Sequence, residues 1–149
     1  MKRKKTDDTG IEVSRQETAL WLSENFARMM ENLNAAVAVV DPDGNLCEWN
    51  KVATQLTGYS RKEVIGHSMA ELMIVRDYQS AAIEMIERGL RGIESSNFEC
   101  EIIRRDESPV FFLVSSSVVR DAQDKVIGVM LVAQDISEGK GKEEELLRY

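Results

Sequence analysis

Residues 48–68 read EWNKVATQLTGYSRKEVIGHS and carry the clearest local signals in the chain. Asn50 follows a strand-like run, where its side chain can accept a hydrogen bond from the first turn of a helix. Ser60 precedes Glu63 by three residues, the spacing of a capping box, in which each side chain bonds the other residue's backbone N–H. The stretch therefore predicts several short helices, with the same capping spacing at Ser68 and Glu71 and glycine breaks at Gly58 and Gly66.

Strand patterns lie on both sides of this stretch. Residues 36–40 are apolar and partly β-branched, and the turn sequence DPDG at 41–44 joins them to a second strand at 45–49. After the short helices, a longer helix is expected from about 77 to 92, and its apolar positions recur on one face. Strands at 97–104, 109–120 and 125–136 follow, joined by short polar turns, so the sheet should be antiparallel.

The segments outside this region divide into a tail, a helix and a linker. Residues 1–13 are predicted to be a disordered tail. A capping-box pattern at Ser14 and Glu17 starts a flanking helix over 14–34. Residues 35–137 form the domain, and 138–149 form a linker and the start of a connector helix. Apolar residues of the flanking helix recur at spacings of three and four, typical of a helix that packs on a sheet or on a second copy: Leu22, Phe26, Met29 and Leu33.

The last strand is apolar on both faces. Ile127, Val129, Leu131 and Ala133 alternate with an outer set of Met130, Val132 and Ile136. A sheet exposed to water on one side should instead alternate apolar with polar residues. We therefore expect the flanking helix, from this subunit or from its partner in a homodimer, to cover the outer face.

The amino-acid composition limits the binding partners and the cellular compartment that we expect for this chain. The formal net charge of -7 argues against a nucleic-acid or anionic-membrane surface, because such surfaces need an excess of Lys and Arg. No run approaches the roughly 20 apolar residues that span a bilayer, so no membrane contact is expected from this segment. Cys47 and Cys100 are interpreted as reduced core thiols, which favours a cytoplasmic location, or a nuclear one in a eukaryote. With His67 as the only histidine, no metal site is expected.

The order of elements and several residues together resemble the PAS signal-sensor family. The resemblance covers about residues 26–137 and rests on Asp41, Gly44, Trp49, Asn50, Leu56, Thr57, Gly58, Tyr59, Glu63, Gly66, Gly128, Asp135 and Ile136. It implies an α+β fold with a five-stranded antiparallel sheet in the order 2-1-5-4-3, short helices on one face, and a small internal pocket. The closing run at 126–137 is most similar to PAS repeats of plant-type phytochromes and of histidine kinases.

The resemblance also bears on cofactors. Flavin-binding members of the LOV subgroup carry a reactive Cys where this chain has Met69, and ring-contacting Asn and Gln where it has Ile102 and Ala133, so a LOV photocycle is not expected. Haem-binding members offer a His near the start of the long helix, where residues 80–82 are Ser, Ala and Ala. We expect no cofactor and a packed core. A small apolar ligand is the alternative, in a pocket lined by Val39, Ile65, Leu72, Ile86, Ile102 and Leu131.

The leading functional hypothesis is a PAS sensory and dimerisation module of a multidomain signal-transduction protein, which relays signals through flanking helices to an output domain outside this chain. A small-molecule or cofactor sensor and a passive protein-docking domain are the alternatives. No catalytic constellation is apparent, so the chain is not expected to be an enzyme. The resemblance places the signal exit at Asp135, Ile136 and Ser137, with Asp135 as the coupling residue or, alternatively, a simple turn or cap acid.

Overall fold

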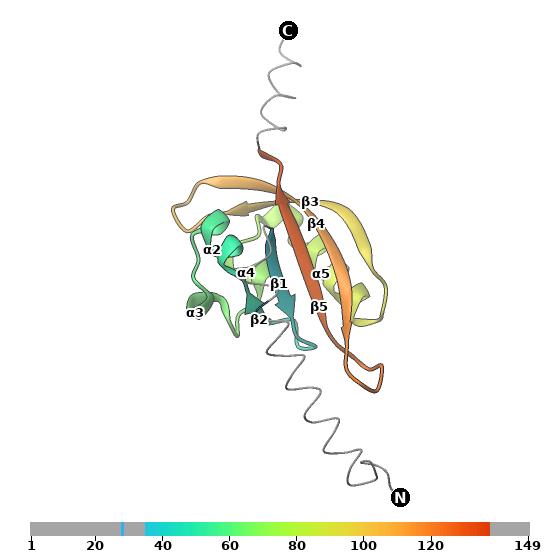
Figure 1. The fold of residues 1–149 in the computed structure, drawn as a ribbon. Helices are drawn as coiled ribbons and strands as arrows, with labels where there is room; N and C mark the ends of the chain where they lie inside the picture. Colours follow the sequence, from blue (N-terminus) through green and yellow to red (C-terminus); the bar gives the residue numbers. More distant parts are fainter. Residues whose placement is uncertain (1–27, 29–34, 138–149) are drawn as a thin grey trace, which may run out of the picture.

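The computed structural model describes residue 28 and residues 35–137. Five strands form one antiparallel sheet in the order β2-β1-β5-β4-β3, as predicted (Figure 1). The strands are β1 (Ala36–Val40), β2 (Leu46–Trp49), β3 (Ser95–Ile103), β4 (Pro109–Arg120) and β5 (Val126–Asp135). Their observed bounds differ from the predicted ones by at most two residues.

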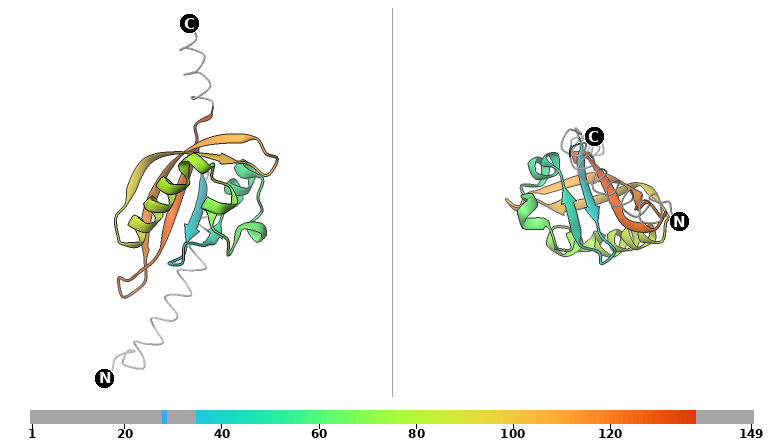
Figure 2. Two further views of the ribbon diagram at one scale, coloured as in Figure 1. Left: turned by 180° about the vertical axis from the view of Figure 1, so that it is seen from behind. Right: turned by 60° about the horizontal axis from the view of Figure 1, so that its bottom comes forward.

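Four helices occupy the connection between β2 and β3. They are α2 (Lys51–Thr57), α3 (Arg61–Val64), α4 (Met69–Leu72) and α5 (Arg76–Leu90). All four lie against the same face of the sheet, and α5 crosses it diagonally when the molecule is seen from behind (Figure 2). We refer to this face as the inner face and to the opposite one as the outer face.

Local capping fixes where these helices begin. The Asn50 side chain accepts from the Ala53 N–H at 2.9 Å, and the reciprocal capping box of Ser60 and Glu63 is complete. At the next helix Ser68 accepts from the Glu71 N–H at 3.4 Å. The capping pattern read from the sequence therefore predicted these three helix starts correctly.

The main core lies between the inner face and the helices. It includes Leu46, Val64, Ile102, Val110 and Val129, each no more than 1 % exposed. Burial of apolar surface of this kind, at roughly 25 cal/mol per Å², dominates the free energy of folding. Both ends of the described domain lie at one end of the sheet, because β1 and β5 are antiparallel neighbours with Ala36 opposite Ala133.

Candidate functional site

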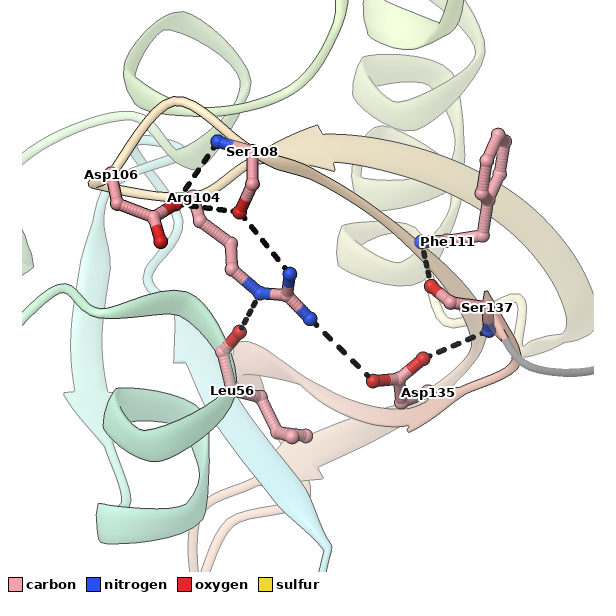
Figure 3. Close-up of polar contacts among 7 residues, drawn as sticks. All are labelled: Leu56, Arg104, Asp106, Ser108, Phe111, Asp135 and Ser137. Carbon is pink, nitrogen blue, oxygen red and sulfur yellow. Dashed lines mark hydrogen bonds and ion pairs between the residues drawn. The ribbon is translucent and has the colours of Figure 1, made fainter. Parts of the chain in front are cut away.

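The last residues of the described domain form a polar junction at the end of β5. We call Asp135, Ile136 and Ser137 the exit junction, because the chain leaves the sheet there (Figure 3). The Ser137 N–H donates to Asp135 Oδ1 at 2.8 Å, and Ser137 Oγ accepts from the Phe111 N–H at 2.9 Å. The Ile136 N–H donates to the Phe111 carbonyl at 2.9 Å. The junction is therefore fixed to the start of β4 as well as to its own strand.

Arg104 connects this junction to the helical side of the domain. Its Nε donates to the Leu56 carbonyl, near the end of α2, at 2.8 Å. One terminal nitrogen donates to Ser108 Oγ at 3.2 Å, and the other lies 3.8 Å from Asp135 Oδ2 (Figure 3). The guanidinium thus holds α2, the β3–β4 turn and the exit junction together through the planar fork that Arg provides.

These contacts differ in strength. The ion pair between Arg104 and Asp135 is long and about one-third exposed on both sides, so it contributes at most about 0.5 kcal/mol. The bond to the Leu56 carbonyl is shorter and charge-assisted, which makes it the stronger contact. Arg104 is therefore held mainly by α2 and only weakly by Asp135.

The β3–β4 turn is docked on the α2–α3 segment by Arg105 as well. The Arg105 N–H donates to the Thr57 carbonyl at 2.9 Å, its guanidinium lies 2.9 Å from Glu63 Oε2, and it sits 6.0 Å from the centre of the Tyr59 ring. The backbone N–H of Ser60, with the nearby Arg105 charge, lowers the pKa of the Glu63 carboxyl. Bonds from Ser108 lower the pKa of Asp106 in the same turn.

A small cavity of about 20 Å³ lies in the main core. That is room for roughly one water molecule, so a larger occupant would have to displace side chains such as Met69 and Met73. Thr57 lines it, and the Thr57 hydroxyl donates to the Ala53 carbonyl at 2.7 Å. The other residues that line it are Ala36, Val37, Ala38, Trp49, Ala53, Ile102, Phe112, Val114, Leu131 and Ala133.

The structure separates the six residues predicted to line a pocket. Ile102 and Leu131 line this cavity, whereas Ile65 and Leu72 are half-buried around the main core. Ile86 is a core residue that lines a different, open hollow beside the β1–β2 turn. The prediction for Val39 is corrected, because Val39 packs in a separate cluster on the outer face. Side chains alternate along β1, so Ala36, Ala38 and Val40 belong to the main core.

A second apolar cluster, the outer cluster, comprises Val37, Val39, Cys47, Val119, Met130 and Val132. Val37 is 0 % exposed and Val39 is 5 % exposed, while Met130 and Val132 are half-buried beside them. Of the three residues predicted for this face, Ile136 is half-buried outside the outer cluster, in the exit junction. The predicted helix residues Leu22, Phe26, Met29 and Leu33 lie outside the described residues.

The remaining candidate groups have ordinary structural environments. Cys47 and Cys100 are free thiols, half-buried and buried respectively, and His67 is exposed, with its carbonyl accepting from the Leu46 N–H. Within residue 28 and residues 35–137, no three His, Cys, Asp or Glu residues gather as a metal site would require. The helices in the part of the chain that the structure describes are all too short or too polar to cross a membrane.

Sequence analysis did not single out Arg104. Its bond to Leu56 joins positions 48 residues apart, and no local spacing predicts such a contact. In the sequence, Arg104 follows Ile102 and Ile103 and precedes Arg105 at the start of a polar turn, where charged residues are common, so it carries no distinguishing local signal.

Comparisons with known proteins agree with the fold and with the sequence resemblance. The chain is 33 % identical over 123 residues to phytochrome C of Sorghum bicolor, which covers 80 % of this chain and 11 % of that protein. It is 28 % identical over 120 residues to phytochrome B1 of Solanum lycopersicum, covering 78 % of this chain and 11 % of the relative. The chain thus spans about a tenth of the length of these curated relatives.

Solved structures share the fold at lower sequence identity. A LOV protein of Rhodobacter sphaeroides superimposes with a TM-score of 0.71 at 17 % identity, over 85 % of this chain and 73 % of that one. The PAS domain of a Colwellia psychrerythraea protein gives a TM-score of 0.67 at 17 % identity, over 78 % and 98 % of the two chains. The family model described as PAS fold matches residues 24–136. Together with the sheet order described above, this match shows that the chain belongs to the PAS-fold family.

Proposed function

We propose that this PAS domain is a sensory and dimerisation module of a multidomain signal-transduction protein, and that it passes changes in its core to an output domain outside this chain. The observation that carries the proposal is the exit junction, where Arg104 connects α2 to Asp135 at the last residue of the sheet. A change in the helical layer would therefore alter the contacts that fix the outgoing chain. The module itself is proposed to be non-catalytic and to act in a reducing compartment.

The outer cluster supports the dimerisation part of the proposal. An apolar cluster on the face opposite the helices is a surface that a flanking helix or a second subunit can cover. We propose that the subunits associate through this face together with Leu22, Phe26, Met29 and Leu33 of the flanking segment.

The relay is tested by Asp135→Ala in the full-length protein. The variant removes both the acceptor of the Ser137 N–H and the partner of Arg104, and we expect the basal output activity to change at least severalfold while the domain stays folded. Asp124→Asn is the matched control, because it weakens another surface ion pair with an Arg, in the β4–β5 hairpin. Equal output from Asp135→Ala and the unmodified protein would reject the relay.

Dimerisation is tested on the 149-residue chain by sedimentation equilibrium. We expect a dimer that Val132→Asp converts to monomer, because a carboxylate on the outer face would be buried without a partner. Ser80→Asp, on the exposed side of α5, should leave the dimer intact. A monomeric unmodified chain at about 100 μM, a concentration at which micromolar interfaces are saturated, would contradict the proposal.

A small-molecule sensor is the second candidate, favoured by the cavity of about 20 Å³ in the main core. Native mass spectrometry and an absorption spectrum of the purified chain distinguish the two candidates. The mass of a bound ligand, or an absorption band in the visible range, would favour the small-molecule sensor.

A further inference from the structure

Helix α2 is bonded to the incoming segment of the domain through Asn50. This side chain is 1 % exposed, and its Nδ2 donates to the Ala35 carbonyl at 2.8 Å. Its Oδ1 accepts from the Val37 N–H at 3.0 Å and from the Ala53 N–H at 2.9 Å. The Asn50 N–H completes the arrangement by donating to the Val37 carbonyl at 3.0 Å. One buried amide therefore joins the start of β1 to the first turn of α2.

The other end of α2 is bonded to the outgoing segment. The Leu56 carbonyl accepts from Arg104 and the Thr57 carbonyl accepts from the Arg105 N–H. Carbonyls in the last turn of a helix have no partner within the helix, so these contacts satisfy groups that would otherwise need water. Arg104 then reaches Asp135 in the exit junction (Figure 3).

Helix α2 is held in place by the contacts at its two ends. It has only seven residues, and a helix of that length is not stable in isolation, so its position depends on these tertiary contacts. Its inner side, at Ala53 and Thr57, lines the small cavity of the main core. An open hollow on its other side is lined by Val52 and Leu56 of α2, by Ala35 and Ala36 of the incoming segment, and by Gln134 and Asp135 of β5.

We propose that α2 is a rigid bracket that couples the incoming and outgoing segments of the domain, with Asn50 and Arg104 as its two positioning residues. The inference rests on the proposed relay function and specifies how the two flanks communicate. The direct contact of β1 with β5 is a first route between them. The bracket is a second route, which passes through the helical layer, and both routes line the small cavity of the main core.

The test is amide hydrogen exchange of the 149-residue chain, measured by NMR for Arg104→Lys. Lys keeps the positive charge near Asp135 but cannot reproduce the fork that also binds the Leu56 carbonyl. The Val37 N–H reports on the other end of α2, because it donates to Asn50 Oδ1. If the two ends are coupled, we expect the Val37 amide to exchange about fivefold faster in the variant. Exchange in the centre of β4 and β5 should be unchanged.

If Arg104 has only a structural role, a different set of amides should exchange faster in Arg104→Lys. If it only holds the β3–β4 turn, exchange increases at Glu107 and Ser108 and stays unchanged at Val37, and this outcome would overturn the proposal. Arg120→Lys is the matched control, since it weakens an exposed ion pair with Asp124 in the β4–β5 hairpin, outside the contacts of α2 described above. An equal effect of Arg120→Lys on Val37 would also overturn it.

The reverse experiment uses Asn50→Ser, which keeps a capping oxygen for Ala53 but removes the donor to Ala35. We expect faster exchange at Ser137 and Phe111, and a smaller increase when Arg104→Lys is already present. Equal increases in both backgrounds would contradict the bracket. If Asn50→Ser does not fold, the Arg104→Lys result at Val37 decides alone.

These measurements need no output domain. Coupled exchange in a chain whose Asp135→Ala variant leaves output unchanged would reject the proposed relay and retain the bracket. Uncoupled exchange in a chain whose Asp135→Ala variant changes the output would reject the bracket and retain the proposed relay.

Discussion

The two cysteines show how position alone sets the chemistry of a side chain. Burial raises the pKa of Cys100 to about 12, with a further contribution from the adjacent Glu101 carboxylate. Burial and the Asp41 carboxylate raise the pKa of Cys47 as well, but Cys47 is half-buried on the outer face. Neither thiol is activated as a nucleophile, because thiol reactivity depends on the thiolate form.

We predict that Cys100 resists thiol reagents in the folded protein. At pH 8 a thiol with a pKa of about 12 is thiolate in roughly one molecule in ten thousand. Cys47 should react first, though more slowly than a free cysteine, in a time course followed by mass spectrometry at pH 8. Cys47→Ser serves as the control that isolates Cys100, and labelling of that variant as fast as in denaturant would contradict the prediction.

At the scale of elements, the packing of α5 on the sheet depends on Gly89. A Cβ at this position would lie 2.7 Å from Val129 Cγ2 and 3.0 Å from its Cγ1. Val129 is 0 % exposed and β-branched, so its side chain cannot rotate away easily. The glycine therefore allows the helix to approach β5 closely.

Gly89→Ala should destabilise the fold by about 1 kcal/mol, although Ala is favoured over Gly in helices by a similar amount, because the clash costs more. Combined with Val129→Ala, the loss should be smaller than the sum of the two single losses, since the new methyl group occupies vacated space. Urea denaturation of the four proteins measures this cycle, with Ser80→Ala as a helix control. Strict additivity would show that the two residues do not interact.

Elements that depend on local sequence were predictable, and those that depend on distant contacts were not. The caps at Asn50, Ser60 and Ser68 are satisfied within three residues, so sequence spacing was sufficient. The run AVAVV in β1 is apolar on both faces, and periodicity could not assign Val39 to one of them. The roles of Arg104 and of Asn50 as a link to Ala35 arise only when the chain folds back on itself.

At the scale of the whole molecule, two hydrogen-bonded carboxylates, Glu63 in α3 and Asp106 in the β3–β4 turn, make the stability of the fold sensitive to acid. The carboxyls of Glu63 and Asp106 both have pKa values lowered in the folded state, mainly by hydrogen bonds from Ser60 and Ser108. A lowered folded-state pKa favours the folded state above the unfolded-state pKa, and this contribution is lost as pH falls through the folded-state value.

We predict that the free energy of unfolding falls as pH is lowered below about 4.5, the ordinary value for Glu63. Glu63→Gln should make this dependence shallower, as measured by urea denaturation between pH 3 and pH 7. Glu84→Gln, on the exposed side of α5, is the control and should leave the slope unchanged. If the free energy of unfolding depends on pH in the same way in Glu63→Gln and in the unmodified protein, Glu63 is not the group responsible.

The pairing of Ala36 with Ala133 places the two points at which the polypeptide crosses the boundary of this domain on adjacent strands. A domain with neighbouring ends can be inserted into a host protein, or duplicated in tandem, without stretching the surrounding chain. Recombination could therefore move this unit between unrelated proteins while each host keeps its own architecture.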